Sequence, residues 1–376
     1  MATTLLVTND FPPRVGGIQS YLRDFVSRLD PSEVVVFAST QNEGEAREHD
    51  AAVPYEVIRW PHRVMLPTRA TVRRMGELIE EYGITTVWFG AAAPLAVMGG
   101  AAKRAGARRV IATTHGHEVG WSMIPGGRRV LRAIGNHADV VTYISDYTLR
   151  RLRGAFGSGP SFVHMPSGVD VGVFCPIDAA RRTRVRDQWG IGHETPLIVC
   201  VSRLVPRKGQ DQLLRAMPRV RAALGQAQLV IVGQGRYEST LRILAHRYDP
   251  TAIFTGGLPF SEMRDLLAAA DVAAVPARTR GKGLDVEGLG IVFLEAQACG
   301  VPVIAGDSGG APETVRPDTG RVVRGNDVVD LAKALVDVVG SASHRTRMGA
   351  AGRRYVEENW SWELMSARLR RLLCDS

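Results

Sequence analysis

The sequence predicts an α/β protein of two domains, each with a parallel β-sheet and flanking helices. The chain has 376 residues, and domains of about 100–200 residues make two domains the natural expectation. Short runs rich in Val, Ile and Thr alternate with helical stretches, which is the pattern of βαβ units. The stretch Pro166-Ser167-Gly168-Val169-Asp170 interrupts this alternation, so the domain boundary is expected there.

The first domain, residues 1–168, is expected to hold strands and helices in alternation. Segments with strand composition between turn residues are Thr4–Thr8, Val34–Ala38, Glu56–Arg59, Thr86–Phe89, Val110–Thr114 and Val140–Ile144. Helices are expected at Ser20–Leu29, Thr71–Tyr82, Leu95–Ala105, Arg128–His137 and Asp146–Phe156. Either Ser145 or Asp146 would cap the last of these helices.

The second domain, residues 169–358, repeats the pattern. Its expected strands are Leu197–Val201, Gln228–Val232, Ala252–Thr255, Val272–Val275, Val303–Ala305 and Arg321–Val323. Its expected helices are Gln210–Leu224, Arg236–Tyr248, Ser261–Ala270, Ile291–Cys299 and Val328–Val339. Two closing helices follow, at about His344–Asn359 and Trp362–Cys374, and the segment 359–376 is treated as a separate C-terminal element.

Composition favours a cytoplasmic globular protein. Apolar residues make up 45% and charged residues 23% of the chain, which is ordinary for such proteins. The N-terminus resembles a first strand rather than a signal peptide, and no stretch approaches the roughly 18 apolar residues of a membrane span. Scattered cysteines argue against a zinc site or disulfide framework and fit a reducing compartment: Cys175, Cys200, Cys299 and Cys374.

The net charge of +9 is unevenly distributed. Two stretches of the first domain are strongly basic and nearly free of acids, and they contain Arg59, Arg63, Arg69, Arg73, Arg74, Lys103, Arg104, Arg108, Arg109, Arg128, Arg129 and Arg132. Such patches suit phosphates, anionic lipid surfaces or nucleic acid, although solvated faces of an arginine-rich chain would look the same. Nucleic acid is not expected as a partner, because the basic residues lack interleaved aromatic side chains or a recognisable module.

Two motifs of the first domain follow predicted strands, at the sheet edge where ligands bind. Gly16-Gly17 precedes a helix, so its amides either approach an anion or form a plain turn. His115, with His117 and Glu118, follows a buried strand. The His-x-His spacing allows a metal pair, but no third ligand is evident. We favour a sugar-binding role for His115. The alternative for His117 and Glu118 is that they cap local structure.

The second domain carries two further motifs. Arg203 and Lys208 lie five residues apart in a loop before a helix, where they predict a diphosphate site or, alternatively, a solvated basic turn. Gly233 and Gly235 form a Gly-x-Gly turn whose expected role is tight packing.

The most informative motif runs from Asp285 to Glu295. Glu287 precedes Gly288-Leu289-Gly290-Ile291, whose amides could meet a sugar or phosphate. Glu295 is expected about one turn into the next helix. A carboxylate in a first helical turn is stabilised by the helix dipole and can accept hydrogen bonds from two ribose hydroxyls. The alternative is that Glu295 is merely an N-terminal helix charge.

Together these motifs resemble the family-four retaining glycosyltransferases of GT-B fold. Arg203, Lys208, Glu287, Glu295 and the following Gly300-Val301-Pro302-Val303-Ile304 resemble the donor domain, and the Gly16-Gly17 loop, His115 and the boundary segment match the other half. Within this family, Asn9-Asp10-Phe11-Pro12-Pro13 and His115-Gly116-His117-Glu118 are similar to actinobacterial phosphatidylinositol mannosyltransferases, with Lys282 departing where a glycine is expected. The resemblance covers essentially the whole chain.

The resemblance implies two Rossmann-like domains facing across a cleft, with the C-terminal helix returning to the first domain. It implies GDP-mannose as donor, no prosthetic group or metal, and phosphatidylinositol monomannoside as acceptor at a cytoplasmic, anionic membrane surface. Donor-binding residues would be Gly16, Gly17, Arg203, Lys208, Gly288, Leu289, Gly290, Ile291 and Glu295. His115 and Glu287 would lie at the reacting sugar, and Asp10 and Gln19 near the acceptor inositol.

The expected chemistry follows from these groups. Arg203, Lys208 and the Gly17 amide would stabilise charge on the leaving diphosphate. Because no clear carboxylate nucleophile is available for double displacement, attack from the face of the departing phosphate is expected. One alternative is the same chemistry with another lipid or a soluble polyol as acceptor. Two further alternatives are a hydrolysing nucleotide-sugar epimerase and a nucleic-acid-binding protein.

Overall fold

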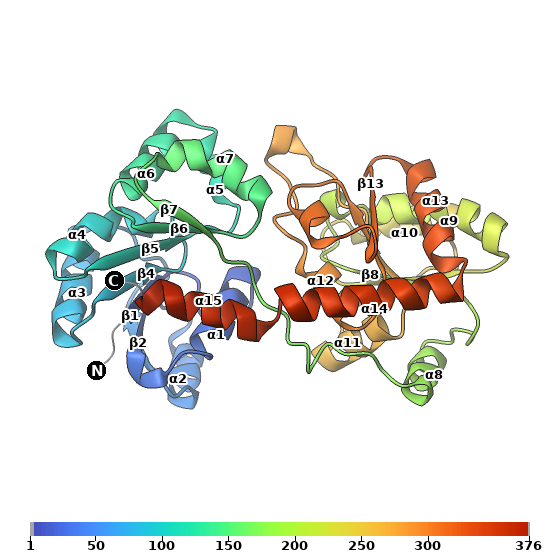
Figure 1. Cartoon of the computed structure of the whole chain (residues 1–376), viewed down its shortest axis with the longest axis horizontal. Coiled ribbons are helices and arrows are strands. Elements are labelled where there is room, and N and C mark those ends of the chain that lie inside the picture. The colour runs from blue at the N-terminus through green and yellow to red at the C-terminus, as the bar shows by residue number, and fades with distance from the viewer. Residues whose placement is uncertain (1–3, 375–376) are drawn as a thin grey trace. The chain divides into compact units, whose positions relative to one another are not determined.

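The computed structural model describes residues 4–374 and divides into two compact units (Figure 1). Unit 1 comprises the chain up to Ser167 together with the segment from Glu363 onward, and unit 2 is Gly168–Trp362. Each unit has its own parallel sheet covered by helices. The predicted class, an α/β protein with two Rossmann-like domains, is confirmed.

The sheet of unit 1 has, within the described residues, seven parallel strands in the order β3-β2-β1-β4-β5-β6-β7. They are β1 (Thr4–Thr8), β2 (Val34–Ser39), β3 (Glu56–Trp60), β4 (Thr86–Phe89), β5 (Arg109–Thr113), β6 (Val140–Tyr143) and β7 (Ser161–His164). The helices of this unit are α1 (Gly17–Val26), α2 (Glu43–Ala52), α3 (Arg69–Glu81), α4 (Gly99–Arg104), α5 (Glu118–Ser122), α6 (Pro125–Gly135), α7 (Asp146–Phe156) and α15 (Trp362–Cys374).

The sheet of unit 2 has six strands in the described chain, in the order β10-β9-β8-β11-β12-β13. They are β8 (Leu197–Val201), β9 (Gln228–Val232), β10 (Ile253–Gly256), β11 (Val272–Val275), β12 (Val303–Gly306) and β13 (Gly320–Val323). The helices are α8 (Ala179–Gln188), α9 (Gln210–Leu224), α10 (Glu238–Tyr248), α11 (Phe260–Ala268), α12 (Ile291–Ala298), α13 (Val328–Val339) and α14 (Ala342–Asn359).

The inner strands are buried along nearly their whole length, because helices cover both faces of a parallel sheet. All residues of β1, β2 and β11 are buried, which explains their continuous apolar runs. Parallel strands point the same way, so the loops after β1, β4 and β5 gather at one edge of the unit 1 sheet. The loops after β8, β11 and β12 gather likewise at one edge of the unit 2 sheet.

Several elements escaped the sequence-based prediction because they carry little apolar pattern. Helix α2 buries only Ala46 and is started instead by the side chain of Asn42, which accepts from the Gly44 amide at 3.1 Å. Helix α8 is arginine-rich and is capped by Asp178, which accepts from the Arg181 amide at 2.7 Å. Strand β7 lies at the sheet edge and has no fully buried residue. Capping and pairing, rather than burial, define these segments.

The alternative between Ser145 and Asp146 as cap of α7 resolves in favour of Ser145. Its hydroxyl accepts from the Thr148 amide at 3.3 Å, and the Thr148 hydroxyl accepts in turn from the Ser145 amide at 3.2 Å. This reciprocal arrangement satisfies two amides that the first helical turn leaves without partners. Asp146 is the first residue of the helix.

The C-terminal helix belongs to unit 1, as expected. Figure 1 shows α15 beside α1 and β4, where the Thr86 hydroxyl donates to the Leu373 carbonyl at 3.1 Å. The division falls at Glu363, four residues later than the predicted 359. Trp362 stays with unit 2 because its indole packs on Gly168, where a Cβ atom would lie 2.7 Å from the ring.

Two helical glycines offer a test of packing. At Gly349 in α14 an added Cβ would lie 1.9 Å from the Gly300 carbonyl oxygen, whereas at Gly76 in α3 its nearest contact would be Ala105 at 3.7 Å. We predict that Gly349→Ala lowers the free energy of unfolding by about 1–3 kcal/mol, because it overpacks a backbone contact. Gly76→Ala should raise it by about 0.5–1 kcal/mol through helix propensity. Urea unfolding of both variants measures this, and shifts of the same sign would contradict the described packing.

Candidate active site

The loop between β1 and α1 brings the two predicted acceptor residues into contact. The amide of Gln19 donates to Asp10 at 2.8 Å, and Gln19 is buried. Gly16 leaves room for this side chain, since a Cβ there would lie 2.2 Å from Gln19 Oε1. Burial raises the pKa of Asp10, and the nearby His117 and Arg14 oppose that rise. The result is a positioned carboxylate with one amide donor.

Gly17 is the first residue of α1, with Gly16 as its N-cap. No side chain caps this helix, and a Cβ on Gly17 would meet nothing within 4 Å. The helix dipole and the amides of the first turn are therefore accessible at this point, as an anion site requires.

His115 lies at the carboxyl end of β5 and is held as a neutral ring. Its Nε2 lies 2.7 Å from the Gly90 carbonyl, which can only accept, so Nε2 carries the proton and Nδ1 is an acceptor. The ring of Tyr21 packs edge-on at 4.9 Å between centroids. Burial lowers the pKa of His115 to about 4. His115 can thus accept a hydrogen bond without carrying charge.

Glu118 has a structural role in the same turn. Its Oε2 accepts from the amides of His115 and Gly116, both at 3.1 Å, and the residue is fully buried. His117 stacks on His115 with ring centroids 6.4 Å apart, and its Nε2 lies 3.4 Å from Glu118 Oε1. Glu118 is therefore the cap that the sequence left as an alternative, and it also orients His115. Among residues 4–374 no cluster of three or more His, Cys, Asp or Glu side chains is arranged to hold a metal ion.

In unit 2 the loops after β8 and β11 bring Lys208 and Glu287 together. The Lys208 ammonium lies 2.6 Å from Glu287 Oε2, and the two side chains are 11% and 10% exposed. Buried charged groups are stable only when paired, and these two side chains pair with each other.

Arg207 completes this cluster, although no sequence pattern distinguished it from its neighbours. Its guanidinium lies 3.1 Å from Asp285 and 3.8 Å from Glu287. Arg278 is a second cationic residue to which no sequence motif assigned a role. Its guanidinium pairs with Asp211 at 3.0 Å, and its backbone amide donates to the Arg207 carbonyl at 2.8 Å. These contacts tie the loop after β11 to the loop after β8.

Close backbone approaches fix the positions of both carboxyl-edge loops. Gly209 has φ 77°, and a Cβ there would lie 2.1 Å from the Pro276 carbonyl. Gly309 has φ 60°, and its Cβ would lie 1.9 Å from the Glu287 carbonyl. Gly233 has the packing role expected of it, since its Cβ would meet the Ser202 carbonyl at 2.1 Å. Only glycine fits these positions, so the glycines hold Lys208 and Glu287 in place.

Arg203 differs from Lys208 in its setting. Its side chain is exposed, while its carbonyl accepts from the buried Gln210 amide at 2.9 Å. The same amide donates to Ser202 Oγ at 2.8 Å. Gln210 thereby positions the backbone of the basic loop and leaves the Arg203 guanidinium at the surface.

Glu295 lies about one turn into its helix, as expected, because α12 begins at Ile291 with Gly290 as its left-handed N-cap and Glu295 is the fifth residue. The expected stabilisation by the helix dipole is corrected, because that effect falls off within the first turn. Burial instead raises the pKa of Glu295 to about 7. Leu289, predicted to offer its amide to the donor, has a buried side chain.

Lys282, the departure noted in the sequence, has φ 54° and lies between Gly281 and Gly283. That left-handed region favours glycine, which accounts for the glycine expected at this position.

Comparison with known proteins identifies the class. A family model described as Glycosyltransferase Family 4 matches residues 15–173, and one described as Glycosyl transferases group 1 matches residues 181–355. The two matches correspond to the two units, and they define a glycosyltransferase.

Relatives that align over nearly their whole length show which glycosyltransferases this chain resembles. The chain is 61% identical over 370 residues to a GDP-mannose-dependent monoacylated alpha-(1-6)-phosphatidylinositol monomannoside mannosyltransferase of Corynebacterium glutamicum, covering 98% of this chain and 97% of the relative. It is 52% identical to GDP-mannose-dependent alpha-(1-6)-phosphatidylinositol monomannoside mannosyltransferases of Mycolicibacterium smegmatis and Mycobacterium tuberculosis, with the same coverage. The chain belongs to the same glycosyltransferase family as these enzymes.

Solved structures support the fold. Anabaena HepE in complex with UDP superposes with a TM-score of 0.81 at 18% identity, covering 100% of both chains. Sucrose-phosphate synthase from Thermosynechococcus elongatus superposes with a TM-score of 0.78 at 23% identity, also with 100% coverage of both. At these identities the likeness concerns the arrangement of the elements alone.

The raised pKa of Glu295 predicts a pH-dependent stability. Between its ordinary value of 4.5 and about 7, the unfolded chain loses this proton while the folded chain keeps it, so wild-type stability falls as pH rises through that window. Above about pH 7 the loss is constant. The free energy of unfolding of Glu295→Gln should therefore rise by about 2 kcal/mol relative to that of wild type between pH 4.5 and 7.5. This value allows for solvent screening at a partly exposed side chain.

Urea unfolding of wild type and Glu295→Gln across this pH range measures the effect. Glu262→Gln, at an exposed position of α11, is the matched control and should show no such trend. A pH-independent difference between Glu295→Gln and wild type would contradict the raised pKa.

Proposed function

We propose that this protein is a retaining α-mannosyltransferase that transfers mannose from GDP-mannose to a phosphatidylinositol monomannoside. The observation that carries the proposal is the buried Lys208–Glu287 pair at the carboxyl edge of the unit 2 sheet, in a chain 61% identical to an enzyme named for that reaction. Charged pairs buried at this edge are more typical of ligand sites than of cores.

Cations of unit 2 bind the donor diphosphate. Arg203 offers an exposed guanidinium and Lys208 a compact charge. In unit 1, the uncapped N-terminus of α1 at Gly17 offers backbone amides that suit an anion. Arg207, held between Asp285 and Glu287, adds positive potential at the loop of Lys208. These groups stabilise the negative charge that grows on the leaving GDP.

Glu287 binds the mannose rather than attacking it. Its carboxylate is compensated by Lys208 at 2.6 Å and lies near Arg207, which lowers its nucleophilicity while leaving oxygens that can accept from sugar hydroxyls. The amides of Gly288 to Ile291 and the carboxylate of Glu295, which is ionised above about pH 7, bind the sugar and the ribose.

The reaction proceeds on one face of the sugar. The bond between the anomeric carbon and the phosphate oxygen breaks, and a bond from that carbon to the acceptor hydroxyl oxygen forms on the same side. The hydroxyl proton passes to the departing phosphate oxygen, so atoms and charge balance without a protein nucleophile. Neutral His115 accepts a hydrogen bond from a sugar hydroxyl through Nδ1. Because the ring is uncharged, it does not repel the positive charge that develops at the oxocarbenium-like carbon.

The acceptor is bound by unit 1, with the Asp10–Gln19 pair at the inositol. A lipid acceptor requires the protein to work at a membrane surface, and no helix in residues 4–374 has the length and apolar content to cross a bilayer. We place the enzyme at the anionic cytoplasmic face as a peripheral protein.

Helix α6 is the best-suited docking surface in unit 1. It contains no acid, and Arg128, Arg129 and Arg132 are exposed along a hollow of 380 Å³. Met123 and Ile124, just before it, are 43% and 57% exposed. Cations beside protruding apolar side chains suit an anionic bilayer surface. On α3, by contrast, Arg73 and Arg74 pair with Glu77 at 3.6 and 3.1 Å, which reduces their attraction to lipid.

Substitution of the buried pair tests the catalytic proposal. Lys208→Ala and Glu287→Ala should each lower turnover by about 10²–10³-fold, because each removes charge stabilisation or sugar binding in the transition state. The double variant Lys208→Ala/Glu287→Ala leaves no lone buried charge, so it should unfold near the wild-type temperature yet remain inactive. Mannose transfer from GDP-mannose to the lipid is followed by mass spectrometry.

Lys333→Ala, at an exposed site on α13, is the control and should keep wild-type turnover. Near-wild-type activity in a correctly folded double variant would refute the assignment.

Vesicle sedimentation tests the docking surface. Binding to phosphatidylcholine vesicles that contain phosphatidylinositol should fall at least about tenfold in Arg128→Gln/Arg129→Gln/Arg132→Gln, since each surface cation contributes about 1 kcal/mol. It should also weaken with added salt. The equal charge loss in Arg69→Gln/Arg73→Gln/Arg74→Gln should have a smaller effect. Equal losses in both triple variants, or salt-independent binding, would rule out α6 as the specific surface.

A further inference from the structure

The amino edge of the unit 2 sheet carries a cluster of arginines that the proposed function does not use. A polar hollow of 320 Å³ lies there, beside the residues that precede β8 and β11. Arg182 of α8 and Arg345 of α14 line it, and Asp271 lies between them. The loops proposed for the donor follow the carboxyl ends of the same strands, so the two places lie at opposite edges of the sheet.

Asp271 is shared by more cations than it can neutralise. Its Oδ1 lies 2.9 Å from Arg182 Nη2 and 3.2 Å from Arg345 Nε. Its Oδ2 lies 3.5 Å from Arg186 Nη1. The Leu197 amide also donates to Oδ2 at 2.8 Å. One carboxylate, 9% exposed, thus faces three guanidinium groups.

Arg186 has a structural role that separates it from the other two. It is buried and donates to the carbonyls of Gly192, Thr195 and Ala269. Burial, and to a smaller extent the nearby charge of Arg182, lower the pKa of Arg186. Arg182 and Arg345 are the more accessible guanidinium groups, with side chains 34% and 25% exposed. Arg345 also donates from Nη1 to the Val339 carbonyl, so its remaining N–H groups are those that can meet a ligand.

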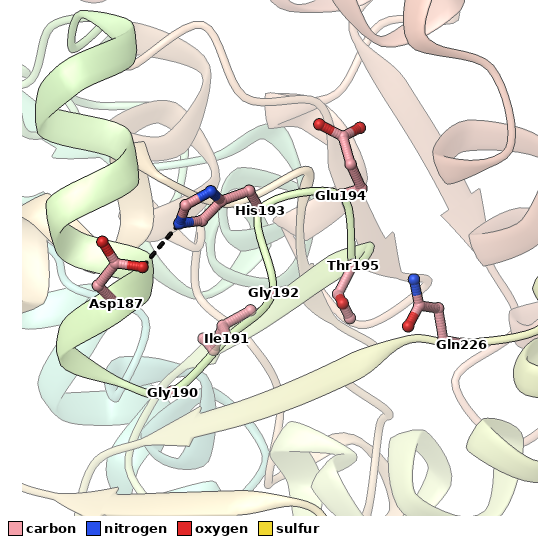
Figure 2. A pocket seen from close by; sticks show the side chains of 8 residues that line it. All are labelled: Asp187, Gly190, Ile191, Gly192, His193, Glu194, Thr195 and Gln226. Carbon is pink, nitrogen blue, oxygen red and sulfur yellow. Dashed lines mark hydrogen bonds and ion pairs between the residues drawn. The ribbon is translucent and has the colours of Figure 1, made fainter.

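Two carboxylates line the hollow. Asp271 and Glu194 lie there with Arg182 and Arg345, and the buried Arg186 adds a third guanidinium beside Asp271. His193 lines it too, but its Nε2 pairs with Asp187 at 2.6 Å, and Figure 2 shows that pair in the adjoining hollow with the Glu194 carboxylate directed away from it. A guanidinium has five N–H donors in a planar fork, and neither Arg182 nor Arg345 uses all of them on Asp271.

We propose that this hollow is a second anion site, distinct from the donor site, which binds a compact phosphate or diphosphate group. Two arginine forks that converge on one hollow match the bidentate recognition of phosphate oxygens. The volume of 320 Å³ is several times the roughly 30 Å³ that one water occupies, so a small oxyanion with its hydration fits. The phosphate comes from a soluble anion or from a lipid headgroup, and binding at this edge leaves the donor loops free.

Titration with inorganic diphosphate by isothermal calorimetry tests the site. The donor loops also attract diphosphate under the proposed function, so the titration is made on wild type and on Lys208→Ala. The second site predicts that the Lys208→Ala chain still binds diphosphate, and that adding Arg182→Gln or Arg345→Gln weakens this binding at least tenfold. Arg184→Gln on α8 and Arg347→Gln on α14, exposed neighbours with the same charge loss, should change it less than twofold.

Absence of diphosphate binding to folded Lys208→Ala protein overturns the proposal, and so does an equal loss in the Arg184 and Arg347 controls. Arg182→Lys and Arg345→Lys keep the charge but remove the fork, and intermediate weakening in them supports bidentate recognition. Sedimentation with phosphatidylinositol vesicles separates the two sources: a loss in Arg182→Gln and Arg345→Gln assigns the site to a headgroup, and unchanged sedimentation assigns it to a soluble anion. Failure of this site leaves the turnover test of Lys208 and Glu287 unaffected.

Discussion

Parallel strands cannot be joined by tight turns, and this constraint shapes both units of the chain. Each strand must be followed by a crossover, usually a helix, before the next strand can run in the same direction. All strand ends of one polarity therefore meet at a single edge, and the loops there carry the residues that folding leaves free for chemistry. His115, Gly17 and Asp10 reach one such edge in unit 1, and Lys208, Arg207 and Glu287 reach another in unit 2.

Charged and titratable groups at these edges are accommodated in different ways. Lys208 and Glu287 lie 2.6 Å apart as an ion pair, while His115 is neutral against the Gly90 carbonyl. Burial raises the pKa of Glu295 to about 7, and within residues 4–374 it forms no ion pair. A glycosyl transition state separates positive charge on the sugar from negative charge on the diphosphate. A site that holds a carboxylate and cations side by side suits that separation.

Burial made many elements predictable from the sequence. Strand β1, with all five residues buried, and helix α13, with six buried residues, have clear apolar patterns, and their bounds agree with the expectation. Strands β3 and β10 have no fully buried residue and are recognisable from their strand composition instead. Helices α2 and α8 bury few side chains and are capped by Asn42 and Asp178, so hydrogen bonds to a few amides define them. At the site, motifs with glycines and charged residues were recognisable, but the place of Arg207 depends on its contacts with Asp285 and Glu287, which are distant in sequence.

The sequence by itself determined the fold class, the domain boundary near Gly168 and the identity of the residues at the strand ends, because these depend on local composition and on the direction of the chain. Only the tertiary structure decided which charges meet. Lys208 and Glu287 are separated by 79 positions along the chain, and Asp271 gathers arginines from two helices far apart in sequence. Electrostatic energy depends on distances of a few ångströms and on burial, and neither quantity exists until the sheets and helices have packed.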